Sequence, residues 1–346
     1  MPCTLVPPYI LQALARQDDP VVRDAGIATL GFDKTFAVNR VLGDTARRRS
    51  VRTAAPVAPR LSRLLHDAQH GEDLPGTLVR SEGDPASADV AVNEAYDGLG
   101  DTWKLYEDVY GRNSIDDAGM DLSGTVHFSE QYDNAYWDGE QMVFGDGDGV
   151  LFNRFTISVD VIGHELTHGV TGATANLAYK NQSGALNESI SDVFGSLVKQ
   201  YALGQSAAEA DWLIGAGLLA ADVHGVALRS MKAPGTAYDD ERLGGKDPQP
   251  AHIRDYVRTT SDNGGVHTNS GIPNHAFYLA AVALGGNAWE QAGHVWYETV
   301  TGGDLESDAT FPQFAQLTVA TADRLFGATA RTAVAGAWTG VGIVTS

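Results

Sequence analysis

Two histidines and a glutamate lie in the stretch Gly163–His168, at spacings that can assemble a metal site. On a helix, His164 and His168 would lie one turn apart on one face and could bind a single zinc ion, as in the HExxH pattern. Glu165 would lie on an adjacent strip, where it can reach a water molecule without being a ligand, as a general base does. Buried, merely hydrogen-bonded histidines would produce the same pattern, so the rest of the chain must decide.

The residues around this motif predict the helix that it needs. Val159, Ile162, Leu166 and Val170 are apolar and recur at spacings of three and four, which is the helical period. We therefore predict a helix over Thr156–Thr171.

A second predicted helix carries two carboxylates that face the same way. Glu188 and Asp192 are four positions apart. Catalytic zinc takes three protein ligands, and two histidines with one glutamate are a standard set, so Glu188 is the predicted third ligand. A ligating histidine usually donates its other ring N–H to a carboxylate, and Asp192 could accept it from His164. A solvated acidic face is the alternative, but the flanking residues are mostly apolar: Leu186, Ile190, Val193, Phe194 and Leu197.

A third cluster, at residues 261–270, contains the pair Gly264-Gly265 followed by His267. The glycines permit a tight turn that would aim His267, and Asp262 is near enough in sequence to orient its ring. Opposite a metal, His267 would stabilise the oxyanion of a tetrahedral intermediate, and Tyr179 could donate a second hydrogen bond. Taken alone, this cluster is only a glycine-rich loop.

Five motifs together resemble the thermolysin family of zinc endopeptidases, in the family's order and at similar separations. The resemblance covers roughly residues 74–346. The motifs are NAYWDGEQMVFGDGDG at 134–149, HELTH at 164–168, NESISD at 187–192, LRSM at 228–231 and DNGGVHTNSG at 262–271.

The resemblance implies a role for each candidate residue. Zinc would be held by His164, His168 and Glu188, with Asp192 supporting His164. Glu165 would be the base and proton shuttle, Tyr179 and His267 would stabilise the transition state, and Asp262 would orient His267.

The same resemblance implies how a peptide would bind. Asn134 and Ala135 would bind the substrate backbone along an edge strand. Arg229 would hold a carbonyl oxygen on the primed side, although a surface salt bridge is a commoner role for arginine. Family members prefer a bulky apolar residue after the scissile bond, and five apolar residues match the pocket wall. They are Phe152, Phe155, Val161, Ile214 and Leu228, which would otherwise be interpreted as core.

The chain departs from the family at its calcium sites. Asp160 and Asp211 are kept, but Lys199 and several apolar residues occupy the other positions. Calcium requires six to eight oxygens. We therefore expect Lys199 to take the place of the ion, which argues against calcium dependence. The stretch Asp146–Gly149 resembles the start of a calcium loop but lacks its later glutamate, and a turn between strands is the prediction.

The amino end has neither a basic region nor the apolar core of a signal peptide. It resembles the short propeptide of the protealysin-like branch of the family, in which Pro7 and Pro8 would mark the motif. Cys3 is the chain's single cysteine. Its thiolate could occupy the water position on zinc and silence the precursor, or it could be an incidental thiol. We expect export without a recognisable signal peptide, with cytoplasmic storage of the precursor as the alternative.

Charge is distributed unevenly along the chain. Residues 1–60 hold nine Lys and Arg against five Asp, a balance of +4, whereas the whole chain is at −20, so the remainder is at −24. A basic strap on an acidic body gains long-range attraction. Residues 43–60 are rich in Arg, Ala and Pro, which predicts an exposed, cleavable linker. Arginine runs also suggest nucleic acid or membrane lipid, but the acidic body argues against both, and no apolar run reaches membrane-spanning length.

The expected architecture is an α+β fold with two lobes around a cleft. We predict a propeptide and linker at 1–60, a β-rich lobe with the HExxH helix at 61–180, and a helical lobe at 181–346. Within the helical lobe, helices are predicted at Asn274–Leu284 and Phe311–Phe326. Ser206 and Glu209 form a predicted capping box.

These features predict a zinc endopeptidase made as a self-processing precursor, acting on proteins or peptides and inhibited by its own propeptide. A zinc aminopeptidase is the alternative within hydrolases, but it needs acidic groups for a free amine, whereas Asn134 and Ala135 suit an internal backbone. A permanently masked zinc-binding protein is the alternative that is not an enzyme.

Overall fold

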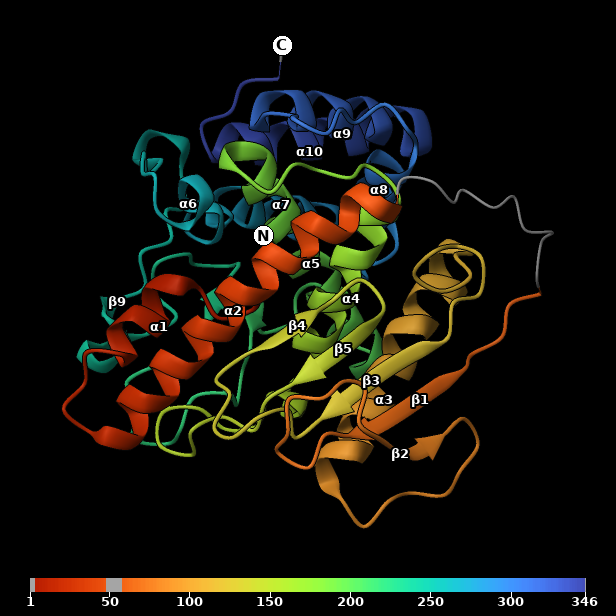
Figure 1. The fold of residues 1–346 in the computed structure, drawn as a ribbon. Helices are drawn as coiled ribbons and strands as arrows, with labels where there is room; N and C mark the ends of the chain where they lie inside the picture. The colour runs from red at the N-terminus through yellow and green to blue at the C-terminus, as the bar shows by residue number, and fades with distance from the viewer. Residues whose placement is uncertain (1–3, 48–57, 346) are drawn as a thin grey trace.

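A computed structural model describes residues 4–47 and 58–345, with side chains for 4–35 and 58–345. The chain forms a sheet-containing amino-terminal lobe and a helical carboxyl-terminal lobe, with two long helices between them (Figure 1). The predicted α+β class is confirmed.

The sheet has the strand order β2-β1-β3-β5-β4. Its central strands β1, β3 and β5 run parallel, while β2 and β4 pair antiparallel at the two edges. The strands are β1 (Arg63–Asp67), β2 (Thr77–Ser81), β3 (Leu122–Val126), β4 (Ala135–Trp137) and β5 (Gln141–Phe144). An edge strand such as β4 offers unpaired backbone groups to another extended chain.

The amino-terminal lobe is less purely β than predicted, because it contains the helix α3 (Val90–Lys104), extended by a π turn at Leu105–Val109. Gly98 and Gly100 weaken the helical signal in the sequence. Glycine at position 98 nevertheless lets α3 pack closely on α4, since a Cβ there would force the end of the Ile162 side chain to shift. Asp89 caps the helix by accepting a hydrogen bond from the Ala91 N–H.

The central pair consists of α4 (Val159–Ala173), preceded by a 3-10 turn at Phe155–Ile157, and α5 (Asn181–Leu203). The helix predicted at Thr156–Thr171 is therefore present, displaced by a few residues. Small residues let the two helices approach closely, because a Cβ at Gly195 would overlap the Asp160 carbonyl oxygen.

The carboxyl-terminal lobe is built from helices, and both predicted helices are found there. The helices are α6 (Asp262–Asn269), α7 (Gly271–Leu284), α8 (Gln291–Thr301), α9 (Phe311–Phe326) and α10 (Ala328–Gly340). Short 3-10 turns lie at Glu241–Leu243 and Ile253–Asp255, and short strand pairs are formed by β6 (Leu213–Ile214) with β7 (Arg229–Ser230) and β8 (Asp239–Asp240) with β9 (Gly245–Lys246). Glu209 accepts from the N–H and hydroxyl of Ser206 as predicted, but no helix follows, so that contact closes only a turn.

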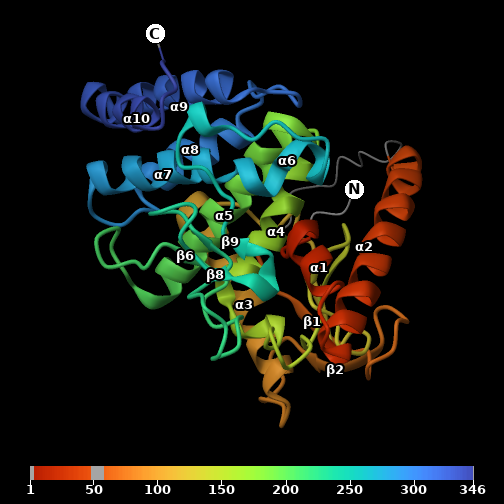
Figure 2. The same cartoon turned by 90° about the vertical axis from the view of Figure 1, so that its left-hand side faces the viewer.

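The amino-terminal segment forms α1 (Pro8–Leu14) and the long α2 (Pro20–Arg47). Figure 1 shows these helices lying across the front of the body, and Figure 2 shows α2 along its edge. Tyr132 and Asp133, just before β4, donate hydrogen bonds to Asp33 and Thr29 of α2. Residues 43–47, the beginning of the predicted linker, continue α2, while 48–57 lie outside the described residues. Among the described helices, none combines the length and apolarity needed to cross a bilayer.

Candidate active site

The packing of α4 against α5 brings His164, His168 and Glu188 together. The two Nε2 atoms are 3.1 Å apart, and each lies 3.5 Å from a different Glu188 oxygen. All three residues are at most 2 % exposed. A carboxylate and two imidazoles thus converge in a dry interior, as a metal site requires.

The hydrogen bonds of the two Nδ1 atoms determine which ring nitrogen of each histidine carries the proton. His164 Nδ1 lies 2.8 Å from Asp192 Oδ1, and His168 Nδ1 lies 2.8 Å from Asn187 Oδ1. Because both acceptors are oxygens, both Nδ1 atoms carry the proton. The two Nε2 lone pairs then face each other beside Glu188. Such a set fits a cation, and two neutral imidazoles with one carboxylate suit zinc.

Asp192 anchors the His164 side of the cluster and is itself fully buried. It accepts two hydrogen bonds from Arg229, at 2.8 and 2.9 Å, and one from Asn274 at 2.8 Å. Burial alone would raise the pKa of Asp192, but the charge of Arg229 and the hydrogen bond from His164 outweigh it and hold the pKa well below its ordinary value. Arg229 is therefore a buried residue and not a surface salt bridge.

Asn187 was missed as the partner of His168. A signal for it exists in the sequence: if Asp192 faces His164 across a packed pair of helices, the partner of His168, one turn further along α4, must lie about one turn earlier on α5. The hydroxyl of Ser191 also lies 3.0 Å from His168 Nδ1.

Glu165 points toward the edge strand and is fully buried. Its Oε2 accepts a hydrogen bond from the backbone N–H of Trp137 in β4 at 3.1 Å. The carboxylate therefore lies between α4, which carries the metal cluster, and β4, along which a peptide could bind.

His267 and Tyr179 lie on the other side of Glu188. Tyr179 donates a short hydrogen bond to Glu188 Oε1, and its hydroxyl is 3.3 Å from His267 Nε2. Asp262 accepts from His267 twice, with Oδ1 2.7 Å from Nδ1 and Oδ2 2.9 Å from the backbone nitrogen. Asn263, Gly264 and Gly265 all have positive φ, which makes the tight turn predicted for this loop.

The electrostatics favour a protonated His267. Burial alone would lower its pKa, but Asp262 and Glu188 outweigh that effect and raise the pKa to about 9. Zinc would offset the contribution of Glu188 but not that of Asp262.

Residues 4–6 of the amino-terminal segment lie along β4, the strand toward which Glu165 points. Leu5 N–H donates to the Ala135 carbonyl at 3.3 Å, Val6 N–H donates to Asn134 Oδ1 at 2.9 Å, and Thr4 bridges antiparallel to Tyr136. These contacts were not predicted residue by residue, because antiparallel backbone pairing leaves no mark in a sequence.

Two carbonyl groups of this segment contact a predicted catalytic residue and a predicted substrate-binding residue. The Thr4 carbonyl oxygen is 3.0 Å from His267 Nε2, and the Leu5 carbonyl accepts from Arg229 Nη1 at 3.0 Å. The Thr4-Leu5 peptide bond is therefore held between His267 and Arg229.

The proline motif lies just beyond these contacts. Pro7 is the cap residue of α1, and its carbonyl accepts from the Ile10 N–H at 3.0 Å, while Pro8 opens the helix. The two prolines thus end the extended segment after Val6. Cys3 lies outside the described residues.

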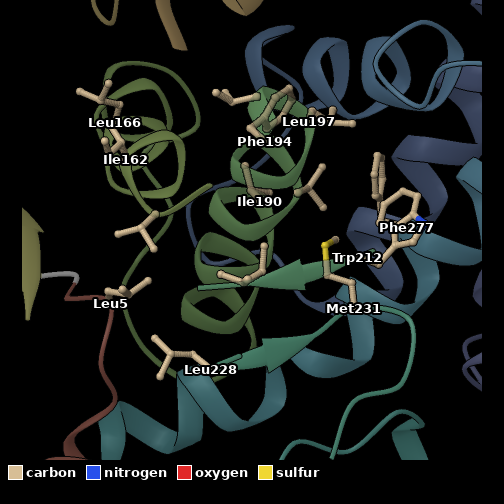
Figure 3. Packing of buried hydrophobic residues seen from close by; sticks show 14 of the residues in the cluster. Leu5, Ile162, Leu166, Ile190, Phe194, Leu197, Trp212, Leu228, Met231 and Phe277 are labelled. Carbon is tan, nitrogen blue, oxygen red and sulfur yellow. The ribbon is translucent and has the colours of Figure 1, made fainter. Parts of the chain in front are cut away.

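The predicted pocket residues share one buried cluster with Leu5. Figure 3 displays part of this cluster, including Leu5 and Leu228. Leu5 is fully buried, and the five predicted wall residues are at most 2 % exposed: Phe152, Phe155, Val161, Ile214 and Leu228.

A lysine cluster is formed by Lys199, Asp160 and Asp211. Lys199 Nζ lies 3.1 Å from Asp160 Oδ2 and 2.8 Å from Asp211 Oδ2. The stretch Asp146–Gly149 does not connect two strands as predicted, because it leads from β5 toward α4; Asp148 Oδ1 accepts from the three backbone N–H groups of residues 150–152.

Comparison with known proteins matches both lobes to one family. Residues 44–172 match "Thermolysin metallopeptidase, catalytic domain" and residues 175–343 match "Thermolysin metallopeptidase, alpha-helical domain". The chain belongs to the thermolysin family. It is a zinc metalloendopeptidase.

Relatives place this thermolysin-family chain in the protealysin-like branch. An extracellular metalloprotease of Pectobacterium carotovorum is 51 % identical over 99 % of this chain and 96 % of its own. Protease PrtS of Photorhabdus is 51 % identical over 98 % of this chain and 91 % of its own. The solved precursor of protealysin from Serratia proteamaculans is 50 % identical, covers 99 % of this chain and 100 % of its own, and superposes with a TM-score of 0.90.

Proposed function

We propose that this metalloendopeptidase cuts internal peptide bonds on the amino side of a bulky apolar residue and is made as a precursor that processes itself. The observation that carries the proposal is the seating of the Thr4-Leu5 bond, with Leu5 buried in the apolar cluster and its carbonyl on Arg229. The segment approaches as an extended backbone, which suits an internal bond and not a free amine.

Each site residue takes one part in the proposed reaction. Zinc held by His164, His168 and Glu188 would supply Lewis acidity toward the peptide carbonyl and toward water. Glu165 accepts the proton of the attacking water and returns it to the leaving nitrogen. Its reach toward β4, where it accepts the Trp137 N–H, supports this role.

The oxyanion would be held by donors on the opposite side of the scissile bond. His267 Nε2, already 3.0 Å from the Thr4 carbonyl oxygen, donates to the developing charge. The Tyr179 hydroxyl, 3.3 Å from His267 Nε2, would redirect its O–H from Glu188 to the same oxygen. Asp262 keeps His267 protonated and aimed. Asn134 and Ala135 hold the backbone of the substrate as they hold that of residues 5 and 6.

The amino-terminal segment, residues 1–60 in the proposed division of the chain, acts as the inhibitor. Residues 4–6 occupy the edge of β4 along which a substrate would bind, so a substrate cannot enter while they are bound. The segment carries +4 against −24 for the remainder, an attraction that weakens as salt rises. We infer secretion of this chain, since its relatives include an extracellular metalloprotease of Pectobacterium carotovorum and an extracellular minor metalloprotease of Serratia marcescens.

Self-processing is tested by incubating the purified full chain beside Glu165→Gln. Without added zinc, we expect one zinc per chain in both proteins. Cleavage of a quenched peptide should rise in the parent as about 50 to 60 residues disappear from the mass, and both changes should be absent in the variant. A trimmed chain that binds zinc without cutting the peptide would favour the permanently masked binding protein.

The apolar preference is tested with a peptide library that varies the residue after the cut. Leu and Phe should give the highest kcat/KM, with each methylene lost costing about 1 to 3 kcal/mol of discrimination at most. Leu228→Lys should lower cleavage of these peptides in particular. A parent profile that demands a charged residue at this position would remove the pocket assignment.

A further inference from the structure

A second cluster of metal-binding side chains lies at the sheet, apart from the zinc ligands. It consists of His70, His127 and Asp146, whose candidate ligand atoms all lie within 4.8 Å of one another. Each residue follows one of the three parallel strands β1, β3 and β5. Because the carboxyl ends of parallel strands meet at one edge of a sheet, the topology brings these three loops together.

The loops that carry the cluster are fixed by their backbones. His70 N–H donates to the His127 carbonyl at 2.9 Å, and Ser129 N–H donates to the Gly71 carbonyl at 2.9 Å. His70 and His127 both have positive φ, at 59° and 55°, a conformation uncommon outside glycine. Two rings are thereby held with their centroids 5.5 Å apart.

Asp146 lies between the two rings. Its carboxylate is 2.8 Å from His127 Nδ1 and 3.5 Å from His70 Nδ1. His127 is partly buried, whereas the His70 side chain is 56 % exposed, so the cluster opens to solvent on the His70 side. An ion could therefore enter without unfolding the loops, and a coordination position would stay available to water.

The far nitrogen of His127 has its own carboxylate. Asp89 Oδ2 lies 2.8 Å from His127 Nε2, and Asp89 is held in place as the cap of α3. When Nε2 donates to Asp89, Nδ1 presents its lone pair toward Asp146 and His70. A carboxylate behind a ligating histidine is the usual support of protein metal sites.

We propose that His70, His127 and Asp146 form a second, surface metal site for a borderline divalent cation such as Zn²⁺ or Ni²⁺, with Asp89 supporting His127. Two imidazoles and one carboxylate favour these ions over Ca²⁺ and Mg²⁺, which prefer oxygen. The bound ion would tie together the ends of three strands, so it acts on stability. Nothing in this inference depends on the proposed specificity or self-processing.

The test counts metal ions on the intact chain. Glu165→Gln is used as the background, because it prevents self-processing in the proposed mechanism, and it is dialysed against increasing Zn²⁺ before metal analysis. We expect two zinc ions per chain. His70→Ala in this background should weaken the second ion at least tenfold and leave the first unchanged, and Asp89→Asn should weaken it by about 10-fold to 100-fold.

The exposed His224→Ala is the matched control and should still bind two ions. Unfolding temperature gives a second readout: Zn²⁺ at about a hundred times the Kd of the second site should raise it by about 5 °C, and not in His70→Ala. Nickel should reproduce the second ion, whereas calcium should not.

Two outcomes would overturn the proposal. If only one zinc binds at every concentration, a protonated His127 bridging Asp89 and Asp146 is the whole role of the cluster. If a second zinc binds but survives both His70→Ala and His127→Ala, the ion lies elsewhere on the chain.

Discussion

The helix pair α4 and α5 holds two polar clusters that differ in where their positive charge comes from. In the lysine cluster, the chain itself supplies an ammonium to Asp160, which is fully buried. In the zinc-ligand cluster, His164 and His168 present lone pairs beside Glu188, and zinc would supply the charge between these three side chains. An ammonium has no open coordination position, so it can stabilise a fold but cannot polarise a carbonyl.

The two clusters also differ in what surrounds them. Lys199 keeps 14 % of its side chain exposed and contacts Asp211, which is 44 % exposed. Burial alone would lower the pKa of Lys199, but Asp160 and Asp211 outweigh it and raise the pKa above its ordinary value. Lys199 therefore remains charged and the lysine cluster is complete without an ion. The zinc-ligand cluster, in contrast, is complete only when zinc is bound.

The largest loss of activity is expected when a zinc ligand is removed. In protein without added zinc, His168→Ala should reduce zinc from one per chain to near zero and reduce peptide cleavage by at least about 10⁴-fold, because metal and base act as a unit. Zinc analysis of dialysed protein with kcat/KM measures both. His224→Ala, at an exposed position, is the control and should change neither; full zinc in His168→Ala would mean that this histidine is structural.

Removing the charge of Lys199 should lower the unfolding free energy and leave zinc binding unchanged. Lys199→Met leaves Asp160 buried without its counter-charge, which costs about 3 kcal/mol of unfolding free energy. Urea unfolding measures this loss, with zinc content unchanged. The exposed pair Arg324–Glu298 provides a control, since Arg324→Met should cost about 0 to 0.5 kcal/mol. Equal stability of the two variants would contradict the role given to Lys199.

How much the sequence could predict follows the same division. Residues linked by helical spacing were placed from the sequence: His164 with His168, and Glu188 with Asp192, because a fixed period of 3.6 puts them on one face. The helix α3 was missed where glycines chosen for close packing, such as Gly98, masked the pattern. Asn187 needed the relative register of two helices, which no single helix encodes.

Contacts between distant backbones were beyond prediction for a different reason. The pairing of residues 4–6 with β4 uses N–H and C=O groups that every residue has. The family resemblance predicted a propeptide through Pro7 and Pro8. Only the structure shows that Thr4, Leu5 and Val6 lie along β4. The Ser206–Glu209 contact shows the converse, since the local signal formed without a helix to follow it.

A smaller effect is expected at the residue that faces the zinc-ligand cluster without joining it. His267→Ala should retain one zinc and a nearly unchanged KM, while kcat falls by about 10²-fold, equivalent to about 2.7 kcal/mol of transition-state stabilisation. Steady-state kinetics on the trimmed enzyme, with zinc analysis, separates these quantities. A raised KM at constant kcat would place His267 in substrate binding instead.

The smallest effect tests whether the lysine cluster has truly replaced an ion. Calcium needs six to eight oxygens, and the Lys199 ammonium already lies between Asp160 and Asp211, so a calcium ion would meet a like charge where it would bind. Millimolar calcium should therefore change the unfolding temperature of the parent by less than about 1 °C relative to the same concentration of magnesium. Lys199→Glu should reverse this behaviour: it places three carboxylates together, is destabilised when calcium is absent, and should regain part of its unfolding temperature when calcium is added. A strong calcium response in the parent would show that a site outside the lysine cluster binds the ion. The contrast between the ammonium of Lys199 and a bound metal ion would then hold only for the lysine cluster and the zinc-ligand cluster.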